Sequence, residues 1–135
     1  MLNRINDGID FQGQALALRS QRQRLIASNI ANADTPGYVA RDFDFAKALR
    51  EATGTLPAGQ GVAITQAGHR AALGANPGQP ELLYATPSQT NLDRNSVDMD
   101  RERAAFVDNA VKYEATLRFI NGHVRTMLEA IKGQS

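Results

Sequence analysis

The stretch that decides the fold is residues 97–132, VDMDRERAAFVDNAVKYEATLRFINGHVRTMLEAIK. It contains no proline, and its large apolar residues recur at alternating spacings of four and three. Residues three and four apart share one face of a helix, so this heptad pattern predicts a single long helix with one apolar seam. The predicted seam consists of Phe106, Ala110, Tyr113, Leu117, Ile120, Val124, Met127 and Ile131.

The start of this helix is marked by polar residues. Asn95 or Ser96 is expected to cap it, with Asp98 at the position where a capping box places an acid. Asp98, Asp100 and Glu102 add negative charge where the helix dipole favours it.

A second long helix is expected over residues 1–33, which also lack proline. Its apolar residues form two stripes on different faces, and one partner helix cannot cover both. The uncovered strips predict lateral contacts with other chains, unless the middle of the chain folds back over them. The main stripe contains Ile5, Ile9, Leu16, Ile26 and Ile30, interrupted by Gln12, Arg19 and Gln23.

The predicted fold is therefore mainly α, with helices at about 1–33 and 97–132 paired as an antiparallel coiled-coil hairpin. Residues 1–33 and 97–135 form the terminal helical domain, and residues 34–53 and 82–96 form a turn and extended region. Residues 54–81 are rich in Gly and Pro and predict a flexible, irregular excursion, with a short strand near Val62–Thr65.

Composition excludes most kinds of catalytic site. The 135 residues include no Cys and no Trp, and only 6% are aromatic, so the chain has neither a thiolate nucleophile nor many large side chains for a thick core. The two histidines, His69 and His123, have no carboxylates at metal-ligand spacing. We therefore expect no enzyme activity, no metal and no cofactor.

Charge and hydropathy also limit the partners. The 15 basic and 14 acidic residues balance in every part of the chain, which argues against a nucleic-acid interface. No segment approaches the length of a membrane span, and Asp7 and Asp10 interrupt the region where a secretory signal would be apolar. If the protein works outside the cytoplasm, we expect export without a cleaved signal peptide.

A sharp turn is predicted where the first helix ends. Pro36 disfavours helical geometry at Thr35, and Pro36-Gly37 suits the central positions of a type II turn, in which Gly adopts a positive φ. Asn29 and Asn32 can hydrogen-bond carbonyls at the helix end or a neighbouring loop. Phe43 and Phe45 alternate, which predicts that they face one side of a short extended segment.

The stretch ASNIANADTPGY at residues 27–38 resembles the N-terminal signature of the axial proteins of the bacterial flagellum. The short length, the stretch NLDRNSVDMDRE at residues 91–102 and the closing helix are most similar to the proximal subunits of the flagellar basal-body rod protein family. The resemblance covers roughly residues 1–50 and 82–132.

The resemblance implies a structural subunit that assembles axially into the drive shaft and export channel of the rod, with its terminal helices lining the inner tube. It implies contacts with copies of itself, other rod proteins, the rod–MS ring junction protein and the flagellar type III export apparatus. The implied location is the periplasmic rod of the basal body. The implied assembly residues are those of the turn region: Asn29, Asn32, Thr35, Pro36, Gly37, Tyr38, Phe43 and Phe45.

The alternative is a soluble coiled-coil adaptor or export chaperone that binds a partner helix. An adaptor needs only its heptad seams, whereas a rod subunit also needs the turn.

The chain departs from the family at one position. Family members commonly have Asp-Gly-Asn before the closing helix, whereas this chain has Asp93-Arg94-Asn95. If the glycine supplies a positive φ there, Arg94 must either avoid that conformation or bear strain.

Overall fold

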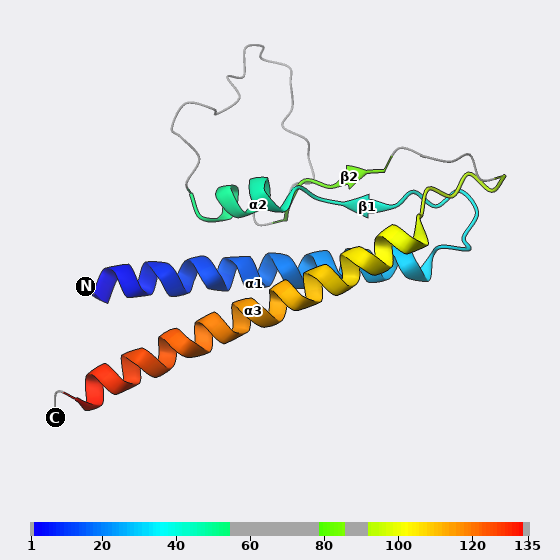
Figure 1. The fold of residues 1–135 in the computed structure, drawn as a ribbon. Coiled ribbons are helices and arrows are strands. Elements are labelled where there is room, and N and C mark those ends of the chain that lie inside the picture. Colours follow the sequence, from blue (N-terminus) through cyan, green and yellow to red (C-terminus); the bar gives the residue numbers. More distant parts are fainter. Residues whose placement is uncertain (1, 55–78, 86–91, 134–135) are drawn as a thin grey trace, which may run out of the picture.

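Two long helices dominate the computed structural model, which describes residues 2–54, 79–85 and 92–133. Helix α1 spans Leu2–Ala31 and helix α3 spans Met99–Lys132. They pack together and run antiparallel, with the N- and C-termini at the same end of the molecule (Figure 1). The mainly α fold with two long, packed terminal helices is thus confirmed.

The helices are closest near the turn end and separate toward the chain termini (Figure 1). From the end of α1 the chain turns back and runs along the other side of α1 from α3. It forms strand β1 (Arg41–Asp42) and helix α2 (Phe45–Ala52) there. Strand β2 (Leu83–Tyr84) pairs with β1 in antiparallel register, Arg41 opposite Tyr84 and Asp42 opposite Leu83.

Helix α2 corrects the sequence interpretation, which expected an extended segment at Phe43 and Phe45. Asp44 caps α2, because its side chain accepts a hydrogen bond from the Lys47 N–H, and Phe45 is the first residue of the helix. Phe43 and Phe45 nevertheless pack in the same cluster. That cluster is centred on Leu18, Phe43 and Ala48, with Leu25, Phe45 and Leu49 packed against it.

The core of the described residues is thin and lies mostly on the α2 side of α1. Six hydrophobic side chains of these residues are buried. Four of them are Ala or Leu, in keeping with a chain that has few large side chains. The buried six are Ala15, Leu18, Ile26, Ala40, Phe43 and Ala48. The strand expected near Val62–Thr65, and most of the excursion expected over 54–81, lie outside the described residues.

Candidate assembly site

The predicted turn is present at the end of α1. Gly37 has φ +72°, and the Tyr38 N–H donates to the Thr35 carbonyl at 3.2 Å, which confirms the turn across Pro36-Gly37. The Gly37 N–H donates to the Asp93 carbonyl at 2.7 Å. The turn is therefore attached directly to the segment that leads into α3.

Asn29 is the central residue of this region, and it is fully buried. Its Oδ1 accepts hydrogen bonds from the Arg41 N–H at 3.0 Å and the Tyr38 hydroxyl at 3.2 Å. Its Nδ2 donates to the Arg41 carbonyl at 2.8 Å and to Glu102 Oε2 at 3.2 Å. One amide side chain thus connects α1, the turn, β1 and α3.

Asn95 satisfies the carbonyl groups at the end of α1. Its Nδ2 lies 2.8–2.9 Å from the carbonyl oxygens of Asn32, Ala33 and Thr35, which follow the last helical residues. Its Oδ1 accepts from the Val97 N–H at 2.8 Å. The interpretation of Asn95 or Ser96 as the cap of α3 was therefore wrong. Asp98 is the N-cap, and it accepts from the Arg101 N–H at 3.2 Å.

Further hydrogen bonds complete what we call the turn network, defined as residues 28–41, 93–97 and Glu102. Ser96 donates its N–H to the Tyr38 carbonyl and accepts from the Ala40 N–H with its hydroxyl. Asn32 Nδ2 donates to the Ser28 carbonyl at 2.8 Å, and its Oδ1 accepts from the Thr35 hydroxyl. Both asparagines that the sequence placed at the helix end therefore make the expected hydrogen bonds.

Charged side chains lie both beside the turn network and within it. Arg22 donates from Nε and Nη2 to the two carboxylate oxygens of Asp42, at 3.2 and 3.0 Å. Burial raises the pKa of Glu102, while the hydrogen bond from Asn29 opposes this shift and the negative charge of Asp42 adds to it. The folded chain therefore disfavours the charged form of Glu102.

Asn29 is buried and Tyr38 is half-buried, whereas the tip of the turn is open. Thr35, Pro36 and Gly37 are exposed, and so is Val39 beside them. The buried asparagines hold the tip in place, and the tip itself faces away from the molecule.

The apolar seams are only partly covered. On α1, Ile26 is buried, and Ile5, Ile9, Leu16 and Ile30 are half-buried. On α3, Tyr113, Leu117, Ile120 and Met127 are half-buried, with Ala110 beside them. Three seam residues of α3 are exposed, namely Phe106 (38%), Val124 (40%) and Ile131 (67%).

Sequence reasoning missed a polar contact between the two long helices. Asn109 is buried and donates from Nδ2 to the Arg19 carbonyl at 2.9 Å and to Gln23 Oε1 at 2.7 Å. The available signal was the interruption of the α1 stripe by Arg19 and Gln23, two polar residues four apart that share a face.

Arg19 also reaches the α2 side of the molecule. Its guanidinium carbon lies 4.3 Å from the centroid of the Phe45 ring, a cation–π contact. Burial lowers the pKa of Arg19, and the nearby positive charge of Arg22 acts in the same direction.

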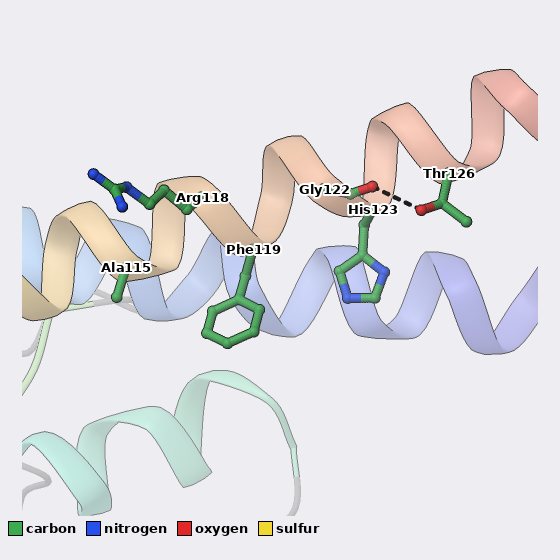
Figure 2. A pocket seen from close by; sticks show the side chains of 6 residues that line it. All are labelled: Ala115, Arg118, Phe119, Gly122, His123 and Thr126. Carbon is green, nitrogen blue, oxygen red and sulfur yellow. Dashed lines mark hydrogen bonds between the residues drawn. The ribbon is translucent and has the colours of Figure 1, made fainter.

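An open hollow of about 480 Å³ lies along the exposed side of α3 (Figure 2). Phe119 and His123 point to the same side of the helix there, and the Thr126 hydroxyl donates to the Gly122 carbonyl at 2.9 Å. The lining offers one imidazole and one guanidinium, from His123 and Arg118, on an otherwise small and apolar surface. This is the chemistry of a packing surface more than that of a catalytic or metal site.

Within residues 2–54, 79–85 and 92–133, no three His, Asp or Glu side chains gather as metal ligands would. Neither of the long helices in those ranges has an apolar stretch that would cross a bilayer. His69 lies outside the described residues.

Comparison with known proteins identifies the family. A family model described as "Flagella basal body rod protein" matches residues 9–38, which include the end of α1 and the turn. The flagellar basal body rod protein FlgB of Salmonella typhimurium is 44% identical, over 98% of this chain and 99% of its own length. The chain belongs to the FlgB family. FlgB of Proteus mirabilis (43%) and of Escherichia coli (42%) match over 98% of both chains.

Membership in the FlgB family makes this chain a structural subunit of the flagellar basal-body rod, and not an enzyme. It assembles with other rod components in the basal body. The match over nearly the whole chain favours this function over that of a soluble adaptor or export chaperone.

Proposed function

We propose that this FlgB-family subunit occupies the proximal rod, in the periplasm, and assembles axially into the drive shaft and the wall of the export channel. The partners in this proposal are further copies of the chain, other rod subunits and the rod–MS ring junction protein. The chain reaches the rod through the flagellar type III export apparatus and then completes its helix packing against its neighbours as a coiled coil.

The observation that carries this proposal is the incomplete cover of α3. Helix α3 has 34 residues, yet only Asn109 and Thr116 are buried, and both are polar. Its exposed apolar residues extend along the whole helix. A helix that buries its apolar face within its own subunit leaves fewer apolar side chains exposed. The exposed large apolar residues of α3 are Phe106, Val107, Val111, Phe119, Val124, Leu128 and Ile131.

We also propose that the turn tip makes a lateral contact with an adjacent subunit, and the turn network supports this. Hydrogen bonds made by Asn29, Asn95 and Ser96 hold the turn against both long helices. A rigid and exposed tip suits a contact with an adjacent subunit, because little conformational entropy is lost when it binds. Phe43 is buried in the core and so supports the tip indirectly, whereas Thr35 and Pro36 are available for contact.

The test is a pair of substitutions at Gly37. Its φ of +72° strains residues with a β-branched side chain, while no atom lies within 4 Å of the place that a Cβ would take. Gly37→Val should therefore distort the turn by backbone strain alone and block incorporation into purified basal bodies. Gly37→Asn is the matched control, since asparagine tolerates this backbone region.

Motility and immunoblots of purified basal bodies give the readout, with expression level measured in the same strains. We expect normal expression of both variants, normal rods with Gly37→Asn, and absent or unstable rods with Gly37→Val. Normal rods and motility with Gly37→Val would refute a role for the turn in assembly.

A further inference from the structure

The face that α3 turns toward α1 is offset from its apolar seam, whose residues are half-buried or exposed. Asn109 and Thr116 are buried, while Phe106 and Val124 of the apolar seam are exposed. Hydrophobic burial alone would turn the helix so that the seam faces α1. Thr116 does not explain the observed rotation, because its hydroxyl bonds to the Lys112 carbonyl within α3.

Asn109 does explain it. Both of its hydrogen bonds are made to α1, at the Arg19 carbonyl and Gln23 Oε1, and both are short. These two acceptors lie one turn apart on α1, so the amide can meet both only when α3 presents this residue directly to α1. If α3 turned to bury its seam, Asn109 would move to the edge of the interface and lose them.

The same contact is poorly designed for stability. Within the described residues, no donor reaches Asn109 Oδ1, although this oxygen is buried. An apolar residue in place of Asn109 would remove this unpaired oxygen, and a buried asparagine between helices is best known for selecting one arrangement out of several.

We propose that Asn109 is a positioning residue that fixes the rotation of α3, through Gln23 and the Arg19 carbonyl, so that part of the apolar seam stays outward for a neighbouring subunit. The use of the seam by a neighbour rests on the proposed function, whereas the rotation itself does not.

The experiment uses cysteine reporters in the full chain, which has no cysteine of its own. Ala105 and Ala110 are both half-buried and lie on opposite flanks of Asn109. Turning the seam toward α1 moves Ala110 inward and Ala105 outward. Ala105→Cys and Ala110→Cys are therefore introduced one at a time, and their rates of reaction with a maleimide are measured with and without Asn109→Leu.

We expect Asn109→Leu to slow labelling at position 110 several-fold and to speed labelling at position 105 several-fold. Gln23→Leu, which removes one acceptor and keeps Asn109, should shift both rates in the same directions. Asn121→Leu is the matched control on an exposed part of α3 and should change neither rate. Opposite changes at the two positions cannot arise from simple loosening of the helix pair, which would speed both.

Unchanged rates, or faster labelling at both positions in both variants, would overturn the positioning role. Incorporation into basal bodies is measured in parallel for Asn109→Leu. Opposite shifts in labelling together with lost incorporation support both the positioning role and the use of the seam. Opposite shifts with normal incorporation would leave the positioning role in place and refute the use of the seam in the rod.

Discussion

At the residue scale, single asparagines hold this fold together where helices end. Asn95 donates to three carbonyl groups that follow the end of α1, and those of Asn32 and Thr35 also accept a backbone N–H within the turn. Asn95→Ala leaves those groups without this donor, so we expect the free energy of unfolding to fall by about 1–3 kcal/mol. Thermal unfolding followed by circular dichroism measures the change.

Asn121→Ala is the control, because Asn121 is exposed on α3. This change should stay within about 0.5 kcal/mol of the parent chain. Equal losses from the two substitutions would show that Asn95 has no special structural role.

Of the two alternatives that the family motif left open for Arg94, the structure shows the strained one. It has φ +55°, the one positive φ of a non-glycine residue in the described ranges. Arg94→Gly should raise the free energy of unfolding by about 1 kcal/mol, because the Cβ clash of this conformation disappears. Arg94→Ala keeps the Cβ and should give no comparable gain. A gain from alanine equal to that from glycine would assign the effect to the lost arginine charge and not to the backbone.

Glu102 gives the molecule a predictable pH response. Burial raises the pKa of Glu102 in the folded chain above its unfolded value, so its contribution to stability is present at low pH and is lost as the pH rises through the folded pKa. Glu102→Gln removes this pH-dependent loss of stability, because glutamine does not ionise. We expect the melting temperature of the variant, relative to the parent, to increase from acidic to neutral pH.

Glu129→Gln, the same substitution at an exposed position, is the control and gives the reference dependence of melting temperature on pH. A Glu102→Gln variant whose melting temperature falls relative to the parent toward neutral pH would show that the charged carboxylate stabilises the fold.

At the scale of the elements, the sequence predicted the long helices well and their contacts less well. The bounds of α1 and α3 differ by at most two residues from the predicted 1–33 and 97–132, because long proline-free segments with regular periodicity are a strong signal. Helix α2 was missed because eight residues carry little periodicity, and the alternation of Phe43 and Phe45 suggested a strand.

The rotation of α3 could not be predicted from its own pattern. The heptad seam places Phe106 in the interface, whereas Asn109 occupies it one turn further on through its hydrogen bonds to α1. Likewise, the role of Asn95 depends on the return of the chain to the end of α1, across more than sixty residues of sequence. Such long-range polar contacts have no local signature.

The half-buried part of the α3 seam allows a test of the helix pair in assembly. Leu117→Asp or Ile120→Asp places a charge in the partly covered interface, which is unfavourable without a partner for that charge. We expect either variant to abolish assembly, measured as loss of motility and of rods in purified basal bodies. Asn121→Asp adds the same charge at an exposed site of the same helix and should leave assembly intact. If the Ile120→Asp strain is as motile as the parent strain, this face is not buried in the rod.

At the scale of the whole molecule, the chain is a pair of long helices with a thin layer of β1, β2 and α2 along one of them (Figure 1). Its core is small, and the apolar surface of α3 is distributed over the helix length. Such a subunit gains much of its buried surface only when neighbours pack against it. The even charge and the scarcity of aromatic residues, which first only excluded other functions, fit this kind of protein.

The most direct test of this account is an electron cryo-microscopy map of basal bodies from the parent strain, with the subunit located by a label. We expect the chain to lie in the rod, with Phe106, Val107 and Val111 in contact with another subunit. A rod in which these three side chains face water would show that neighbours do not complete the packing of α3.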